Sequence, residues 1–106
     1  MPREYLISTT GIADMDRYLD EYVPAALEVV ADHDVELLVN SFDPDVVDGE
    51  WPHDLTTVAA FPSREAARDW WHDETYQSAA LQQMREELFD YTNLLFVSGF
   101  DPPTYG

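Results

Sequence analysis

The sequence predicts a small α+β domain in which one four-stranded antiparallel sheet packs against helices. Three observations lead to this prediction. The chain has 106 residues, which is a usual length for one domain. Strand-like and helical polarity patterns alternate along it, without internal repeats. It contains no cysteine, so the fold depends on a hydrophobic core rather than on disulfides.

The first half of the chain predicts a strand, a helix and a second strand. Residues 4–10 are rich in β-forming side chains, and Asp14 is a suitable N-cap for the helix that follows. Pro24 lacks the N–H that would bond the carbonyl of Asp20, so we expect a kink there. Residues 35–42 predict the second strand. The apolar face of the helix consists of Met15, Tyr18, Leu19, Tyr22, Val23, Ala26, Leu27 and Val30.

The second half of the chain predicts a strand, a helical region and a last strand. Residues 55–61 have strand character, and Ser63 is the expected N-cap of a short helix. Thr75 is the expected N-cap of a further helix. Residues 91–100 then predict the last strand.

This order of elements, β-α-β-β-α-β, is the split βαβ or ferredoxin-like arrangement. We expect a single domain over residues 1–106, with its core over about 4–100 and a C-terminal tail at 101–106. The N-terminus leads directly into the first strand and has no feature of a signal or transit peptide, so we expect a cytoplasmic protein.

The strands carry apolar side chains toward both faces of the sheet. Leu37, Leu38 and Val39 follow one another in the second strand, and residues 94–97 read LLFV in the last. A sheet with water on one face alternates apolar and polar residues instead. Because the chain has no spare helices for the second face, we expect a homodimer in which two sheets pack face to face.

The charge of the chain predicts a salt-rich environment. It has 22 Asp and Glu against five Arg and no Lys, a formal net charge of −17. Such self-repulsion destabilises a compact state in dilute buffer, and about 1 M salt screens it because the Debye length is then ~3 Å. We therefore expect adaptation to a salt-saturated cytoplasm, as in halophilic archaea. Nucleic acids and membrane surfaces are not expected partners, because both require a basic patch.

His53 is the candidate catalytic residue. It follows a Trp-Pro pair at the start of the third strand, where the proline restricts the loop. An imidazole there is either a general base, or a group that polarises a substrate carbonyl, or an ordinary loop histidine beside Asp54. His33 and His72 lie near expected helix C-termini, where a protonated imidazole interacts favourably with the helix dipole.

Tyr18, Tyr22, Trp51 and Trp70 are the candidate ligand-binding residues. Tyr18 and Tyr22 lie one turn apart, and their hydroxyls either orient a ligand or are core groups bonded to the backbone. Trp51 is either a loop anchor or a pocket wall. Trp70 and Trp71 are adjacent on a helix, so we expect one against the sheet and the other at a pocket edge or dimer rim. Neither a metal nor another cofactor is expected, because no metal-ligand spacing or nucleotide-binding glycine motif occurs.

Several segments resemble one known family. They are Tyr5-Leu6-Ile7, the helix start at 14–18, GEWP at 49–52 and above all FPSREAARDWW at 61–71, followed by Tyr76-Gln77. Together they resemble the domain-of-unknown-function 1330 family over roughly residues 4–99. The resemblance implies a dimeric α+β barrel of ferredoxin-like topology. That superfamily includes cofactor-free monooxygenases, small-lactone isomerases and stress-response barrels, whereas the family itself has no agreed activity.

Two functions from different classes remain open. The first is a homodimeric barrel that binds a small, largely apolar or carbonyl-containing molecule, either only as a binding protein or as a cofactor-free enzyme. Its pocket would lie between the first helix and the sheet or near the 51–53 loop, with His53 as acid–base group and Tyr18 and Tyr22 as orienting donors. The second is a non-catalytic structural, stress-response or protein-interaction domain, in which the aromatic residues only fill the core and interface.

Overall fold

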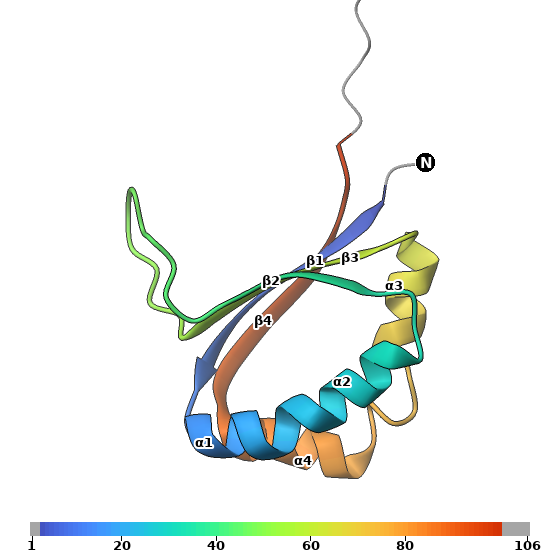
Figure 1. The fold of residues 1–106 in the computed structure, drawn as a ribbon, viewed down its shortest axis with the longest axis horizontal. Coiled ribbons are helices and arrows are strands. Elements are labelled where there is room, and N and C mark those ends of the chain that lie inside the picture. The colour runs from blue at the N-terminus through green and yellow to red at the C-terminus, as the bar shows by residue number, and fades with distance from the viewer. Residues whose placement is uncertain (1–2, 101–106) are drawn as a thin grey trace, which may run out of the picture.

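The computed structural model describes residues 3–100, so the tail expected at 101–106 lies outside the described residues. Four strands form one sheet, and helices cover one of its faces (Figure 1). In chain order the elements are β1 (Glu4–Ile12), α1 (Met15–Arg17), η1 (Tyr18–Tyr22), α2 (Val23–Ala31), β2 (Glu36–Ser41), β3 (Leu55–Phe61), α3 (Arg64–Trp71), α4 (Ala79–Leu88) and β4 (Phe89–Ser98).

The strands lie in the order β2-β3-β1-β4, and every neighbouring pair is antiparallel. β1 and β3 are therefore central, and β2 and β4 are edge strands. This is the ferredoxin-like α+β fold that the order of elements predicts. In the register, Ser8 of β1 lies opposite Thr57 of β3 and Leu94 of β4, so these three side chains share the face that the helices cover.

The predicted first helix forms, with an irregular turn just before Pro24. The Asp14 side chain accepts a hydrogen bond from the backbone N–H of Arg17, which confirms the predicted N-cap. The N–H of Val23 bonds the carbonyl of Tyr18, five residues back, so η1 is one π-helical turn. Pro24 has no N–H and its ring crowds the turn before it, and the wider π turn accommodates both effects.

The helical region after β3 begins as predicted but continues differently. Ser63 caps α3 by accepting a hydrogen bond from the backbone three residues further on. The prediction that Thr75 caps the next helix is wrong, because Ser78 caps α4 instead. Thr75 lies in a separate turn, where Asp73 Oδ1 accepts the backbone N–H groups of Thr75 and Tyr76 at 2.8 and 3.1 Å.

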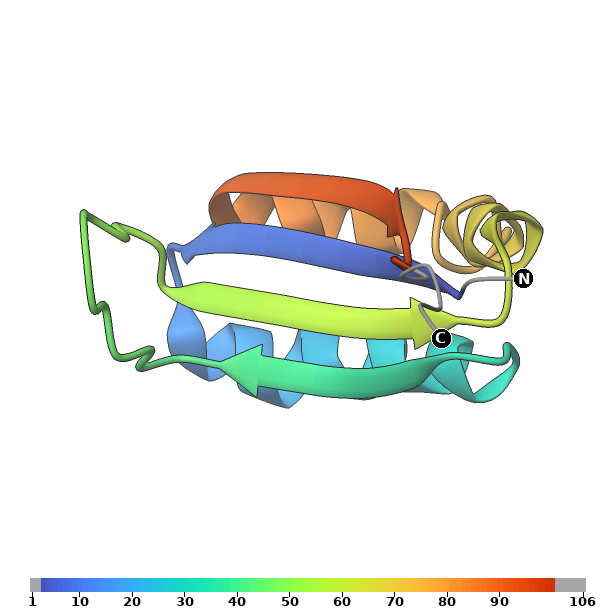
Figure 2. The ribbon, with the colours of Figure 1, turned by 90° about the horizontal axis from the view of Figure 1, so that it is seen from above.

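The core lies between the helices and one face of the sheet. Val29, Phe61 and Leu88 are the largest fully buried side chains, and they come from α2, β3 and α4. Seen from above in Figure 2, no helix within residues 3–100 lies over the other face, which we call the open face. The large aliphatic side chains that the register places on the open face are partly exposed: Ile7, Val39, Val58, Leu95 and Val97.

An ion pair between a buried carboxylate and an exposed arginine joins the start of β1 to the start of α3. The Glu4 side chain is 3% exposed and accepts hydrogen bonds from Arg64 Nε at 2.7 Å and Ser98 Oγ at 2.8 Å. Burial alone would raise the pKa of Glu4, but the two hydrogen bonds and the charges of Arg64 and Arg68 outweigh it and hold the pKa below its ordinary 4.5. Glu4 is therefore ionised inside the fold.

Arg64→Met is expected to lower the free energy of unfolding by about 1–3 kcal/mol at pH 7, because it leaves a buried carboxylate without its charged partner. Glu4→Gln is expected to have a smaller effect, because Arg64 is 57% exposed and remains hydrated. Since folding lowers the pKa of Glu4, its contribution is complete above the unfolded value near 4.5 and is lost as the pH falls through the folded value. Urea denaturation from neutral to acid pH measures both effects.

Arg3→Met is the matched control for this experiment. The ion pair between Arg3 and Glu36 is exposed on both sides, so its loss is expected to change the free energy of unfolding by no more than about 0.5 kcal/mol. Equal losses for the two arginine variants would contradict the prediction. So would a difference between wild type and Glu4→Gln that grows toward acid pH.

Candidate functional site

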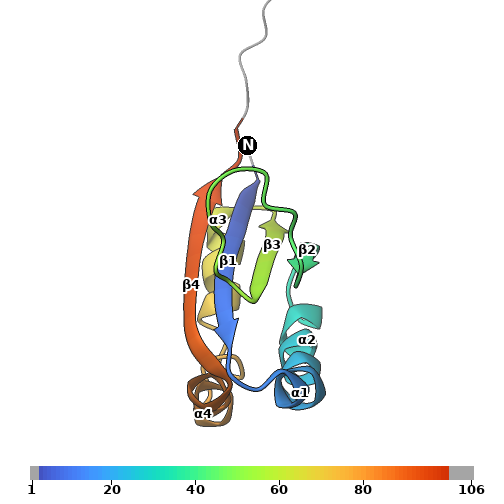
Figure 3. The ribbon, with the colours of Figure 1, turned by 90° about the vertical axis from the view of Figure 1, so that its left-hand side faces the viewer.

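A cavity of about 170 Å³ lies between the helices and the inner face of the sheet. All four strands contribute to its sheet wall, and η1 and α2 form its helix wall. Seen from the end, α1 and α2 lie beneath the β2 side of the sheet and α4 beneath the β4 side (Figure 3). An engineered cavity of roughly 150 Å³ binds benzene, so this volume suits a molecule of roughly six to ten non-hydrogen atoms.

Three of the predicted ligand-binding residues line this cavity. Tyr18 and Tyr22 are both 6% exposed, and their rings stack with centroids 5.8 Å apart. Trp70 of α3 also lines it and packs against Tyr76, with ring centroids 4.6 Å apart. Of the tryptophan pair, Trp70 is thus the inward-facing member, and Trp71 is half-buried beside it. The cavity therefore lies at one of the two positions considered for a pocket, between the first helix and the sheet.

Tyr76 and Arg85 form a cluster with Tyr22 that the sequence did not reveal. Arg85 donates to the Tyr22 hydroxyl at 3.3 Å and to the Tyr76 carbonyl at 2.9 Å, and its guanidinium lies 4.5 Å from the Tyr76 ring centroid. Burial and the neighbouring Tyr22 raise the pKa of Tyr76 and outweigh Arg85, so the hydroxyl is neutral. One sequence feature pointed to Arg85: it lies four residues after Leu81 and three before Leu88, on their side of the helix.

Hydroxyl and amide side chains form part of the sheet wall. Thr57 Oγ1 donates to Asn40 Oδ1 at 2.9 Å, and the hydroxyl oxygens of Thr10 and Thr92 are 3.2 Å apart. Ser8 also lines the cavity and is 9% exposed. The sequence did not single out these residues, because Ser and Thr are ordinary in strands and only the cross-strand register brings them together.

Trp51 and His53 do not line the cavity. His53 Nδ1 and the Tyr91 hydroxyl oxygen are 2.6 Å apart, and that hydroxyl donates to the Pro52 carbonyl at 3.0 Å. A tyrosine hydroxyl has one hydrogen, so Nδ1 is the donor and Nε2 carries the lone pair of the neutral imidazole. Trp51 Nε1 donates to Thr56 Oγ1 at 2.8 Å, so Trp51 anchors the loop before β3.

The His53 group lies on the open face of the sheet. Tyr91 pairs with Gly11, and its ring lies so close that a Cβ at Gly11 would collide with it. The preceding pair, Thr10 and Thr92, faces the cavity, and successive strand residues point to opposite faces. The structure thus brings Tyr18, Tyr22 and Trp70 together and places Trp51 and His53 on the other side of the sheet.

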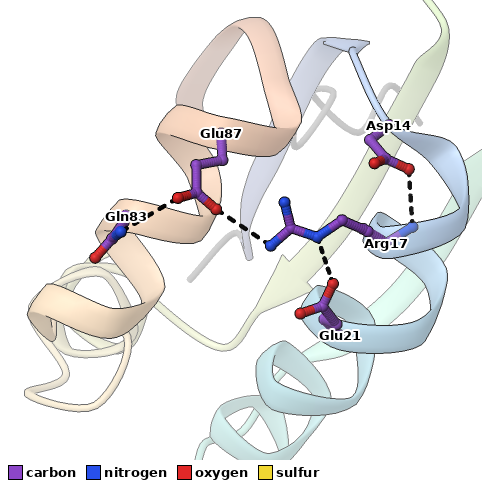
Figure 4. Close-up of polar contacts among 5 residues, drawn as sticks. All are labelled: Asp14, Arg17, Glu21, Gln83 and Glu87. Carbon is purple, nitrogen blue, oxygen red and sulfur yellow. Dashed lines mark hydrogen bonds and ion pairs between the residues drawn. The ribbon is translucent and has the colours of Figure 1, made fainter.

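A histidine–carboxylate hydrogen bond and an ion pair hold together the segments that surround the cavity. His33 Nε2 and Asp73 Oδ2 are 2.8 Å apart, which joins the end of α2 to the turn that carries Tyr76. Hydrogen bonds from His33 and from the Tyr76 backbone lower the pKa of Asp73, so it is a carboxylate. Arg17 of α1 donates to Glu87 of α4 at 3.1 Å and joins these two helices (Figure 4).

The residues that line the cavity within 3–100 include no Arg, Asp, Glu or His. In the same part of the chain, no three His, Asp or Glu side chains are grouped in a way that could hold a metal ion. None of the helices described has the length and apolar character needed to cross a bilayer.

The sheet order and the cavity define a ferredoxin-like α+β domain with a small pocket between helices and sheet. The chain belongs to the family described as Domain of unknown function (DUF1330), whose model matches residues 3–100. No curated protein matches the chain.

Several solved structures share the fold. The methylated RPA0582 protein of Rhodopseudomonas palustris aligns with a TM-score of 0.72 at 13% identity, over 97% of this chain and 84% of that one. A dimeric ferredoxin-like protein of unknown function from Thermobifida fusca aligns with a TM-score of 0.60 at 13% identity, over 92% and 91%. A Nipsnap family protein of unknown function from Agrobacterium tumefaciens gives 0.55 at 16% identity, over 95% and 93%. At these identities the likeness shows the fold alone.

Tyr22→Phe is expected to lower the free energy of unfolding by about 0.5–1.5 kcal/mol, because it removes the hydroxyl that bonds Arg85 and Tyr76. Tyr18→Phe is the matched control, since Tyr18 has the same exposure on the same turn and its hydroxyl bonds no other side chain or backbone group within residues 3–100. It is expected to change stability by less than about 0.5 kcal/mol. Chemical denaturation in molar potassium chloride compares the two, and equal losses would contradict the assignment.

Proposed function

We propose that the protein binds a small, largely apolar molecule in the cavity between η1–α2 and the sheet. The observation that carries this proposal is an unfilled volume of about 170 Å³ bordered by buried core side chains from the helices and the sheet. Apolar side chains from helices and sheet form most of its walls, and a few polar groups converge on it, which is the usual character of a ligand pocket. A non-catalytic core would be expected to fill this space.

The binding proposal predicts that filling the cavity abolishes ligand binding. Ala26 of α2 lines the cavity, so Ala26→Leu is expected to occupy it without unfolding the domain. Toluene at ten times its Kd should stabilise the wild type by about 1.4 kcal/mol, or roughly 5–10 °C in a thermal melt. The same toluene concentration should leave the melting temperature of Ala26→Leu unchanged.

Ala80→Leu is the matched control, because Ala80 is an exposed helix residue on α4. It should retain the toluene response. A wild type that shows no response to toluene or to a panel of small uncharged metabolites in molar potassium chloride would contradict the binding proposal. A response that Ala26→Leu retains would place the ligand elsewhere.

We also propose that two copies pair through their open faces. Ile7, Val39, Leu95 and Val97 form an apolar surface on a face without helices, and such a surface is costly for a monomer in water. The Thermobifida fusca protein of similar fold is described as dimeric. The net charge of −17 on each chain opposes pairing in dilute buffer, so association should strengthen as salt is added.

Leu95→Asp is expected to weaken self-association at least a hundredfold, because pairing would bury an unpaired charge. Leu19→Asp is the control: Leu19 is 47% exposed on η1 and Leu95 is 49% exposed on the open face, and both variants add one negative charge. Sedimentation velocity in molar potassium chloride should find a dimer for the wild type and Leu19→Asp, and a monomer for Leu95→Asp. A monomeric wild type would overturn the pairing proposal.

In this proposal, any acid–base reaction that involves His53 takes place on the open face of the sheet. Its Nδ1 is engaged with Tyr91, which leaves Nε2 as the proton acceptor. A second copy paired on this face would cover the region of Tyr91 and shield the imidazole from water. A substrate of His53 would therefore lie between the two sheets and not in the cavity.

A further inference from the structure

The polar side chains of the sheet wall follow the strand register. Ser8 of β1 lies opposite Thr57 of β3, and Thr57 lies opposite Asn40 of β2, so the three form one row across neighbouring strands. Thr10 and Thr92 form the adjacent row. All five line the cavity. Their chemistry contrasts with the aliphatic residues on the same face of the sheet, and it gives the cavity one hydrogen-bonding side.

Several polar groups of this cavity have hydrogen-bonding capacity that the described residues do not use. The hydroxyls of Ser8 and Tyr18 bond no other side chain or backbone group within residues 3–100, although both residues are at least nine-tenths buried. Asn40 accepts from Thr57 through Oδ1, which leaves its Nδ2 amide hydrogens for another partner. Within residues 3–100, the fully buried side-chain polar atom without a partner is Trp70 Nε1, and Trp70 also lines the cavity. Because buried polar groups are nearly always hydrogen-bonded, this donor and the two hydroxyls point to a bound molecule that carries a polar atom.

The same walls are unsuited to an ion. No Arg, Asp, Glu or His side chain lines the cavity among residues 3–100, so a buried charge there would have no counter-ion. Burial and the neighbouring Tyr22 raise the pKa of Tyr18 to about 12, so this hydroxyl is neutral at physiological pH.

The position of the opening follows from the exposure of the lining residues. Leu27 of α2 and Leu37 of β2 both line the cavity and are both 49% exposed. Asn40 lines it as well and is exposed on the same strand. These residues mark one opening of the cavity between α2 and the edge strand β2, and the buried Ser8 lies further inside.

We infer that the ligand is an uncharged alcohol or carbonyl compound whose oxygen faces the Ser8–Thr57–Asn40 row and whose hydrocarbon part faces the aliphatic side chains of α2. This inference rests on the proposed function, because it assigns a chemical class to the molecule in the same cavity. It also names Ser8 and Asn40 as residues that determine specificity.

The test compares three probes of similar shape, namely toluene, benzyl alcohol and benzoate, by NMR titration in molar potassium chloride. Toluene and benzyl alcohol are expected to bind the wild type, and benzoate is not. Ser8→Ala should weaken benzyl alcohol about three- to tenfold, the usual effect of one hydrogen bond, and leave toluene within about twofold. Tyr18→Phe, which removes the other unpaired hydroxyl, should act in the same direction.

Ser41→Ala is the matched control, because Ser41 of β2 pairs with Thr56 on the open face. It should leave both affinities unchanged. Two results would overturn the assignment of the ligand class while the cavity remained a binding site. The first is benzoate binding as tight as that of benzyl alcohol. The second is that Ser8→Ala and Tyr18→Phe each weaken toluene as much as they weaken benzyl alcohol. No binding of toluene or benzyl alcohol to the wild type, or binding that Ala26→Leu does not reduce, would instead contradict the proposed function.

Discussion

Four strands present two faces that both carry apolar side chains, and the described chain supplies helices for only one of them. Water must be excluded from the inner face for the sheet to be stable, and η1, α2, α3 and α4 provide that cover. The π turn at η1 accommodates Pro24 and still keeps Tyr18 and Tyr22 on the sheet side. The cavity is the space that this single layer of helices leaves unfilled.

The few cations of this acidic chain are used at specific contacts. Arg64 compensates the buried Glu4, Arg85 bonds two tyrosines at the cavity, and Arg17 joins α1 to α4. Salt affects these contacts unequally. The pairs of Arg17 are exposed and are screened within a few ångströms in molar salt, whereas the charge on Glu4 is buried and is screened much less. The network around Glu4 is therefore the one that persists in a salt-rich medium.

The sequence predicted the features that depend on neighbouring residues. Runs of β-forming residues located β1 to β4, and the short polar side chains of Asp14 and Ser63 identified two helix starts correctly. The prediction of Thr75 as an N-cap was wrong. Asp73, two residues earlier, accepts the backbone N–H of Thr75 and holds it in a separate turn. Thr75 and Ser78 are both good capping residues, so local preference alone does not distinguish them.

The features of the site that the sequence did not predict depend on distant residues. Tyr22 meets Arg85, 63 positions away, and Ser8 meets Thr57 only through strand pairing. Periodicity does assign Tyr18, Tyr22 and Trp70 to apolar helix faces, and all three line the cavity. The sequence placed His53 correctly in a loop before the third strand. It did not show on which face of the sheet that loop lies.

Salt and ligand chemistry are connected in this molecule. The net charge predicts that the protein works in molar salt, where the Debye length of ~3 Å removes most long-range attraction between a charged ligand and its site. Apolar burial and short hydrogen bonds to neutral groups do not depend on long-range charge, so they remain effective there. A cavity with apolar walls and hydroxyl groups, and with no ionic side chain among the residues 3–100 that line it, uses only these interactions. Its composition is therefore the one that physical chemistry favours for recognition in brine.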